Sequence, residues 1–342
     1  MNVLTRRVGL ACAALLAAMV APAGGAAAAA GPAVVAATTF PGTITDEQWK
    51  VFVRAVAARA DPPLPLKMMI RGELGAEEAM VAAARRGRVQ IAATSLAGTS
   101  QTVPELAVLA LPYLFDTTEQ MDALLAGVVP AAIAPLFDAR GLVFLDWIDS
   151  GWVGLYAQDP LTEPGQLAGY KLRTPAVLAA QAMAQVLQAD AVYIPYPDII
   201  PALQTGLIRG GITADYPFFT GGIDAEARYF IYTRHTYDVG AILANKAWFD
   251  SLSPANRAIV RTAWGDSAEF RARTRAYTAA AMAKLPAKGT EVVELTPEQR
   301  ARWASATRPV HAKVLEQLGP GAQALYDAIA AAKAEWARAH AP

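Results

Sequence analysis

A short basic segment in the middle of the chain has residue types and spacing suited to binding an anion. Lys171-Leu172-Arg173 has the character of a strand, and Thr174-Pro175 closes it. An Ala-rich helix, a second strand and a helix ending at Gln204-Thr205-Gly206 follow, which together predict a βαβα unit. Ligands bind at the carboxyl ends of strands in open α/β sheets, and a guanidinium there can donate paired hydrogen bonds to a carboxylate. We therefore predict a carboxylate-binding cleft anchored by Arg173.

The two basic residues of this segment are not equivalent. Lys171 lies two residues before Arg173, so both side chains point to the same face of the strand. Lys171 should nevertheless lie roughly 6–7 Å farther from the carboxyl end. We expect Lys171 to be a solvated or structural charge behind the cleft. An ion pair at the surface or between domains is the alternative for Arg173.

Other candidate residues follow neighbouring predicted strands. Thr94 and Ser95 come after an expected strand and could donate hydrogen bonds to a ligand, or could cap the turn that follows. Glu73 could contact the ligand or begin a helix, and we expect a structural role at the cleft edge. Aromatic residues could line a mostly apolar pocket, although core packing is the alternative for each and the expectation for Trp147. The predicted aromatic lining residues are Trp152, Tyr196, Tyr216 and Phe218.

The signals of an enzyme are weak in this sequence. The three histidines, His235, His311 and His340, are scattered along the chain. No Gly-rich phosphate loop follows a strand, and no Gly-x-Ser-x-Gly nucleophile motif occurs. We predict no catalytic residues, no metal ligands and no cofactor. An exported hydrolase is the formal alternative, but no residue set supports it.

The N-terminus has the pattern of a secretory signal peptide over residues 1–30. Arg6 and Arg7 precede an apolar run from Val8 to Val20, and small residues follow as a cleavage site. Removal of this segment takes away the only cysteine, Cys12, and two arginines, which leaves a net charge of −2. We predict a periplasmic protein that binds neither nucleic acid nor an anionic membrane.

The remaining sequence predicts an α/β protein. Strands alternate with helices over the first part of the mature chain, which implies a parallel sheet covered by helices. The chain should cross into a second domain near Asp149-Ser150-Gly151, and a single long helix should begin at Pro254 and run to about Lys284. The other expected strands include 33–39, 64–70, 89–93, 142–148, 229–232 and 240–245.

An ordered set of short motifs resembles the substrate-binding proteins of tripartite ATP-independent periplasmic (TRAP) transporters, the DctP family. Each motif is weak alone, but the order and spacing of the set are specific, and the resemblance covers nearly the whole mature chain. The motifs are Gly72-Glu73-Leu74-Gly75, Pro104-Glu105-Leu106, Leu111-Pro112-Tyr113-Leu114-Phe115, Leu167-Ala168-Gly169-Tyr170-Lys171-Leu172-Arg173, Pro195-Tyr196, Ala202-Leu203-Gln204-Thr205-Gly206 and the segment from His235 to Asn245.

The resemblance implies an α/β, two-domain periplasmic binding protein of the type II-like form. Such a fold has an interdomain cleft, crossing strands and a long helix along its back. The boundaries that we expect are 31–150 plus about 238–275 for domain I, 151–237 plus about 286–315 for domain II, 276–285 within the long interdomain helix, and 316–342 for the C-terminal helices.

The resemblance also implies a function. Such a protein closes its domains on an organic acid, held by the arginine that matches Arg173, and delivers it to a small and a large membrane subunit. We expect it to act as a monomer. A binding protein that serves a sensor is the alternative, because both uses need the same closing cleft.

Two departures from the family pattern change the expected ligand. Val153 stands where many members carry a second arginine, and Thr213 stands where a substrate-contacting asparagine is usual. Both changes make the predicted pocket less polar. We therefore predict a monocarboxylate with an apolar or aromatic body.

Overall fold

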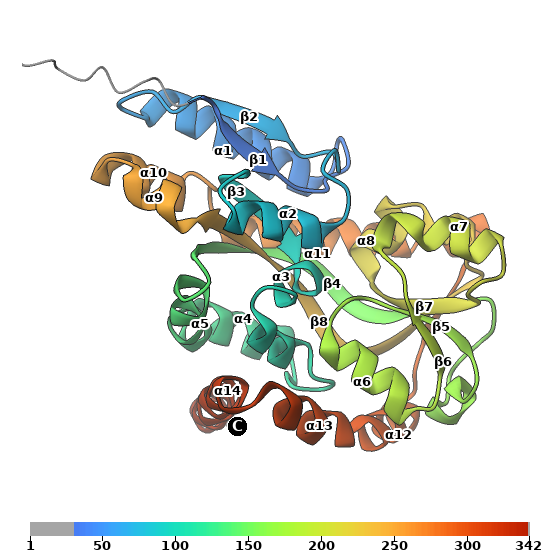
Figure 1. The fold of residues 1–342 in the computed structure, drawn as a ribbon. Coiled ribbons are helices and arrows are strands. Elements are labelled where there is room, and N and C mark those ends of the chain that lie inside the picture. The colour runs from blue at the N-terminus through green and yellow to red at the C-terminus, as the bar shows by residue number, and fades with distance from the viewer. Residues whose placement is uncertain (1–30, 341–342) are drawn as a thin grey trace, which may run out of the picture. The chain divides into compact units, whose positions relative to one another are not determined.

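A computed structural model gives the structure of residues 31–340, and the predicted signal peptide, residues 1–30, lies outside the described residues. The described residues from 32 onward form one compact unit. Its centre is a nine-stranded sheet in the order β2-β1-β3-β8-β4-β7-β5-β6, with β9 paired to β8, and helices pack around it (Figure 1). This arrangement is the α/β fold that the sequence predicts.

The first part of the described chain is the predicted βαβαβ unit. Strand β1 pairs in parallel with β2 on one side and β3 on the other. Helix α1 buries Trp49, Phe52 and Val56, which recur at helical spacing and cover one face of the sheet. The elements of this unit are β1 (Ala33–Ala36), α1 (Ile44–Arg59), β2 (Leu66–Met69), α2 (Glu77–Arg85), β3 (Ile91–Ser95) and α3 (Leu96–Ser100).

Two long antiparallel strands cross the middle of the sheet. They are β4 (Leu142–Ala157) and β8 (Tyr229–Asn245), which pair along almost their whole lengths. The segment Asp149-Ser150-Gly151, where the crossing into a second domain is expected, lies within one strand, and a register shift between Asp149 and Gly151 bends it. The two predicted strands at 229–232 and 240–245 are likewise parts of one strand.

A second group of parallel strands lies on the far side of β4. Strand β5 pairs in parallel with both β6 and β7, and β7 pairs antiparallel with β4. Arg173 therefore lies on a strand with neighbours on both sides, as the predicted βαβα unit requires. The elements are β5 (Lys171–Thr174), α6 (Leu178–Val186), β6 (Asp190–Tyr193), α7 (Ile199–Gln204), β7 (Gly210–Ala214) and α8 (Asp215–Thr220).

The prediction of one long helix from Pro254 to about Lys284 is wrong. The segment forms two helices, α10 (Pro254–Thr262) and α11 (Ser267–Met282). Gly265 between them has φ +79°, which interrupts the helix. The Asp266 side chain then accepts hydrogen bonds from Ala268 N (2.9 Å) and Glu269 N (3.1 Å), so it caps the second helix.

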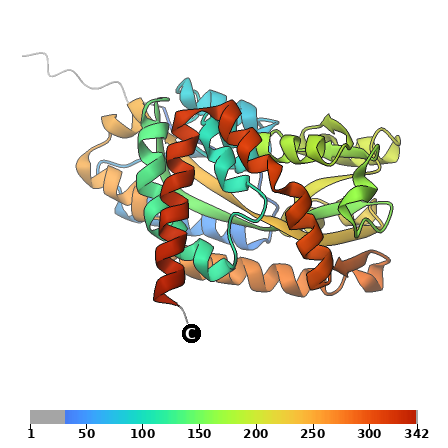
Figure 2. The same cartoon turned by 90° about the horizontal axis from the view of Figure 1, so that it is seen from below.

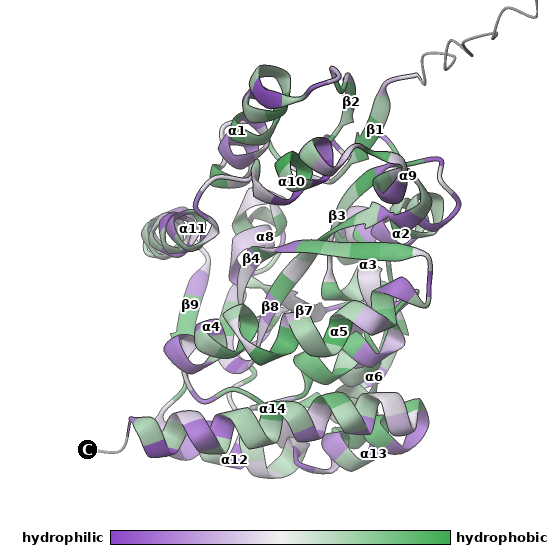
Figure 3. Cartoon of the chain, turned by 90° about the vertical axis from the view of Figure 1, so that its left-hand side faces the viewer, coloured by the Kyte–Doolittle hydropathy of each residue, from purple (hydrophilic) through white to green (hydrophobic). Residues whose placement is uncertain are grey.

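The C-terminal helices lie along one side of the sheet (Figure 2). Helix α13 packs against α6, and α14 packs against α5, so these helices link early and middle parts of the chain. Figure 3 shows α14 banded in apolar and polar colours, and its buried side is formed by Ala322, Leu325 and Ile329. The remaining elements are α4 (Thr118–Ala126), α5 (Val128–Asp138), α9 (Lys246–Ser251), β9 (Glu291–Glu294), α12 (Pro297–Thr307), α13 (Pro309–Leu318) and α14 (Pro320–Ala339).

Within residues 31–340, no single helix is both long enough and apolar enough to cross a membrane. The bent pair α4–α5 passes the same test of length and composition when its two helices are taken together. Its apolar residues Met121, Leu124, Val129 and Ile133 are buried in the protein core.

Candidate functional site

A cavity of about 210 Å³ opens where the two groups of parallel strands face each other across β4 and β8. Its lining comes from the carboxyl ends of β1 and β3, from the start of α2 and α6, and from β7 and α8. This volume exceeds the space that a single buried water needs by roughly an order of magnitude. The place matches the general rule that ligands bind beyond the carboxyl ends of strands.

Arg173 lines this cavity and is only 5% exposed. Its Nε donates to the Ile194 carbonyl at 2.8 Å, and its Nη1 donates to the Ile212 carbonyl at 2.9 Å. Gly211 lies beside it on β7, where an added Cβ would crowd Arg173 Cβ. In the described part of the chain Nη2 makes no hydrogen bond, so both of its N–H donors remain for a ligand on a fixed guanidinium.

Five other predicted site residues also line the cavity: Thr94, Ser95, Tyr196, Thr213 and Tyr216. The Tyr216 and Thr45 hydroxyls lie 3.2 Å apart and join α8 to α1. Tyr196 donates its hydroxyl to the Pro217 carbonyl at 2.7 Å. Ser95 caps α3, the alternative considered for it, and its hydroxyl donates to Glu77.

The structure does not bring three predicted residues to the cavity. Phe218 is fully buried against Phe230, because it lies two positions after Tyr216 on a helix and points to the opposite side. Trp152 packs edge-on against Tyr237, because its neighbour Val153 takes the cavity face of the strand. Glu73 is exposed and accepts a hydrogen bond from Arg71 N at 2.7 Å, within its own turn.

Trp147 and Lys171 lie where the sequence predicts. Trp147 is 4% exposed and donates from its indole nitrogen to the Leu125 carbonyl at 3.0 Å, as expected of a core residue. Lys171 is exposed on β5, behind Arg173. Val153, the predicted replacement for a second arginine, is buried and lines the cavity with an apolar surface.

Sequence reasoning missed three carboxyl groups of the cavity, Glu77, Glu78 and Asp238. Glu77 begins α2, close to motif residues, and the start of a helix beside a strand end could have marked it. Asp238 lies in the middle of β8, where no strand-end or motif signal exists. His235, expected to be structural, also borders the cavity and bonds through Nδ1 to the Thr233 hydroxyl at 2.7 Å.

Burial controls the ionisation of these groups. Burial, together with the nearby Glu77 carboxyl, raises the pKa of Asp238 to about 7. Burial also raises the pKa of Glu77, while hydrogen bonds from Ser95 oppose that shift. Burial lowers the pKa of His235 to about 3, so this imidazole is neutral at physiological pH. Burial lowers the pKa of Arg173 too, yet a guanidinium stays protonated in proteins.

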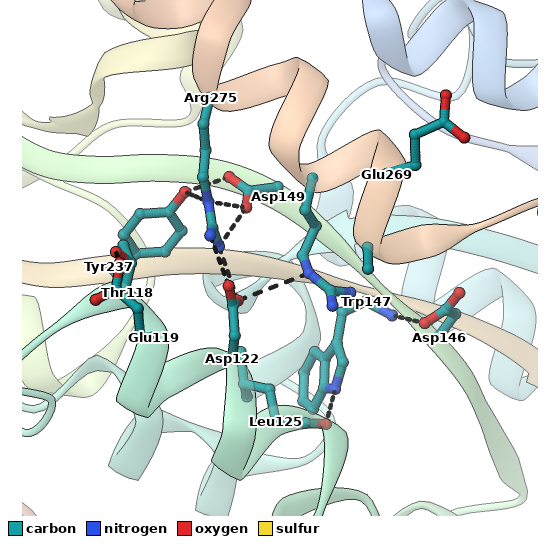
Figure 4. A network of polar contacts seen from close by, with 12 residues as sticks. Thr118, Glu119, Asp122, Leu125, Asp146, Trp147, Asp149, Tyr237, Glu269 and Arg275 are labelled. Atoms are coloured by element: carbon teal, nitrogen blue, oxygen red, sulfur yellow. Dashed lines mark hydrogen bonds and ion pairs between the residues drawn. The ribbon is translucent and has the colours of Figure 1, made fainter. Parts of the chain in front are cut away.

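A polar network lies beside the cavity and joins α11 to the crossing strands (Figure 4). Arg275 reaches from α11 to Asp149 on β4 and to Asp122 on α4. The Tyr237 hydroxyl donates to Asp149 Oδ1 at 2.5 Å. The Asp149 carboxylate is therefore occupied by protein donors, although this residue also borders the cavity.

The described residues show no evident metal centre. Across residues 31–340 no three His, Cys, Asp or Glu side chains gather closely enough to hold an ion. The arrangement instead offers one buried cation with free donors, apolar walls and two enclosed carboxyls, which suits the binding of a small polar solute.

Comparison with known proteins places the chain in a family. The family described as "Bacterial extracellular solute-binding protein, family 7" (DctP) matches residues 35–318. The C4-dicarboxylate-binding periplasmic protein DctP of Rhodobacter capsulatus is 28% identical over 251 residues, which cover 72% of this chain and 74% of that protein. The ectoine/5-hydroxyectoine-binding periplasmic protein UehA of Ruegeria pomeroyi is 26% identical over 295 residues, which cover 84% and 86%.

Solved structures share the fold. A TRAP periplasmic solute-binding protein from Roseobacter denitrificans, solved with bound β-D-glucuronate, aligns with a TM-score of 0.82 at 23% identity, over 87% of this chain and 98% of that one. This likeness confirms the predicted fold class. The family match covers most of this chain, so the chain belongs to the DctP family, family 7 of the bacterial extracellular solute-binding proteins.

Proposed function

We propose that this protein is the periplasmic solute-binding component of a TRAP transporter. It captures an organic acid in the cavity at Arg173 by domain closure and hands it to the membrane subunits. The solute is a monocarboxylate with an apolar or aromatic body, and the protein binds it without chemical turnover. The expected domain boundaries, near residue 150 and again near residue 238, are part of this proposal.

The Arg173 guanidinium is the observation that carries the proposal. Two of its nitrogens are fixed by carbonyl groups, while Nη2 has no acceptor among residues 31–340 and the residue lines the cavity. A buried guanidinium is stable when its remaining donors find an acceptor. A ligand carboxylate supplies that acceptor and neutralises the charge.

The walls of the cavity support an apolar body. Small and aliphatic side chains form much of the lining, among them Ala37, Ala93, Ile148, Val153, Ala180 and Met183. A sugar acid needs a polar partner for each of its hydroxyl groups, since an unpaired buried hydroxyl is costly. The relatives named above bind dicarboxylates, ectoines or glucuronate according to their descriptions, so a charged group that an arginine can hold is common to these ligands.

Contacts across the cavity support closure. The Thr45 and Tyr216 hydroxyls meet at 3.2 Å, and Tyr193 donates its hydroxyl to Glu78 at 2.9 Å. Each pair joins the N-terminal α/β unit to the segment between β4 and β8. Such contacts form when two domains close on a solute.

The proposal is tested by measuring the affinity of Arg173→Met and Arg173→Lys for a panel of carboxylates by isothermal titration calorimetry. Loss of the charge-assisted hydrogen bonds should weaken binding about 10- to 100-fold in Arg173→Met. Arg173→Lys keeps the positive charge but loses the paired hydrogen bonds of the guanidinium. Its affinity should therefore lie between those of the wild type and Arg173→Met. Lys171→Met, which removes an exposed cation from the same strand, is the matched control and should bind normally.

Two results would contradict the proposal at different levels. Unchanged affinity in a folded Arg173→Met variant would rule out Arg173 as the carboxylate anchor. A preference for glucuronate or galacturonate over benzoate and other apolar monocarboxylates would overturn the apolar-body assignment, while carboxylate capture would stand.

A further inference from the structure

Asp238 is a cavity carboxyl that accepts no hydrogen bond within the described residues. It lies on β8, borders the cavity, and is partly exposed to it although protein surrounds the side chain. The Ser150 hydroxyl and the Leu96 N–H lie close enough to lower its pKa. Among the described residues, neither donor reaches it with the distance and angle of a hydrogen bond. The acceptor positions of Asp238 are therefore available to a ligand.

The other acidic residues of the cavity are already bound by protein donors. Asp149 accepts hydrogen bonds from Tyr237 and Arg275. Glu77 accepts from the Ser95 N–H at 3.1 Å and from the Ser95 hydroxyl. Glu78 accepts from Tyr193. Asp238 differs from all three.

The acidic groups of the cavity have no cation left to pair with once a carboxylate binds. Arg173 is the one lysine or arginine among the lining residues in the described part of the chain, and His235 is neutral. A bound carboxylate neutralises Arg173. Asp238 and Glu77 then face the same enclosed space with no further cation, and burial raises the pKa of both, so a ligand that supplies a cation favours their charged forms.

We propose that Asp238, with Glu77 close by, forms a second subsite that binds a cationic nitrogen of the solute, so that the ligand is a zwitterion whose carboxylate lies on Arg173. This inference rests on the proposed capture of a carboxylate by Arg173. Arg173, which is 5% exposed, keeps its Nη2 free in the same cavity within the described residues, and this supports a polar ligand there.

The ionisation of Asp238 supports this assignment. Its pKa of about 7 means that burial and Glu77 disfavour the anion when the cavity is empty. A cation placed against the carboxyl favours the anion and donates the hydrogen bond that the protein does not supply. An apolar frame between the two charged ends fits the aliphatic walls.

The experiment compares four ligands of nearly equal size by isothermal titration calorimetry. Cyclohexanecarboxylate has no cationic nitrogen, whereas the 2-, 3- and 4-carboxylates of piperidine carry one at increasing distance from the carboxylate. At least one piperidine isomer should bind about tenfold or more tightly than cyclohexanecarboxylate. In Asp238→Asn this preference should disappear, while the affinity for cyclohexanecarboxylate should be kept or increased.

Two further variants complete the design. Glu77→Gln should reduce the preference less than Asp238→Asn, and it provides a second test if Asp238→Asn folds poorly. Asp190→Asn removes an exposed carboxylate on β6 and should behave as the wild type.

The proposal is overturned if cyclohexanecarboxylate binds the wild type as tightly as every piperidine isomer, or if both cavity variants keep the preference. Those results would leave capture of a carboxylate by Arg173 intact. Failure of Arg173→Met to weaken any of the four ligands would instead contradict the proposed function itself.

Discussion

Arg275 donates a hydrogen bond from Nε to Asp149 Oδ2 across 3.0 Å and so ties α11 to the middle of β4. The same guanidinium donates to both oxygens of Asp122, at 2.6 and 2.8 Å. The Asp149 side chain is 2% exposed, while that of Arg275 is 27% exposed. This contact lies two residues before Gly151, where β4 bends. The network therefore fixes α11 to β4 at the point where this strand bends.

Removal of the Arg275 charge should destabilise the protein. Arg275→Leu leaves Asp149 buried beside Asp122 without a cation, which should lower the free energy of unfolding by about 3 kcal/mol. Adding Asp149→Asn should recover part of that loss, because the uncompensated charge is then gone. Urea unfolding of the two single variants and the double variant measures this coupling. Strictly additive losses would show that the two residues do not interact.

The stability of the protein should depend on Asp215 as the pH changes. Burial raises the pKa of Asp215 from 3.8 to about 7, against hydrogen bonds from Tyr232 and Tyr216 that lower it. The unfolded chain therefore releases this proton near pH 4, while the folded protein keeps it until about pH 7. The contribution of Asp215 to stability is largest below pH 4 and is lost as the pH rises to 7.

Asp215→Asn should flatten this dependence. The amide stays neutral and can still accept the hydrogen bond from Tyr216 N, which is 2.8 Å from Asp215 Oδ1. Relative to the wild type, the variant should gain on the order of 3 kcal/mol between pH 4 and pH 8. Urea unfolding at five pH values in this range measures the slope, with the exposed Asp190→Asn as the control. An unchanged slope would contradict the raised pKa.

Gly151 should tolerate a side chain less well than other glycines with positive φ. It has φ +101°, and an added Cβ would overlap Asp215 Oδ1. Gly206 has φ +70° but open space around it, so Gly206→Ala should cost only the backbone strain, about 1–2 kcal/mol. Gly151→Ala should cost at least about 2 kcal/mol more. Equal unfolding midpoints and slopes in urea for the two variants would refute the close packing at the bend.

The sequence by itself determined the local elements and the anchor of the site. Alternating strands and helices predict the parallel β1, β2 and β3, and the position of Arg173 at a strand end predicts its place in the cavity. These signals are local, because strand alternation, helix caps and strand ends are set by a few neighbouring residues.

Only the tertiary structure decided which further side chains line the cavity with Arg173. Phe218 and Tyr216 are two positions apart, but helix rotation sends one into the core and the other to Thr45. Asp238 lies within a strand and carries no local signal, and it faces the cavity because β8 pairs with β4 across a long stretch of intervening sequence. Pairing between strands so far apart in the sequence is fixed by the packing of the whole sheet. The place of Asp238 in the cavity, unlike that of Arg173, is therefore not predictable from neighbouring residues.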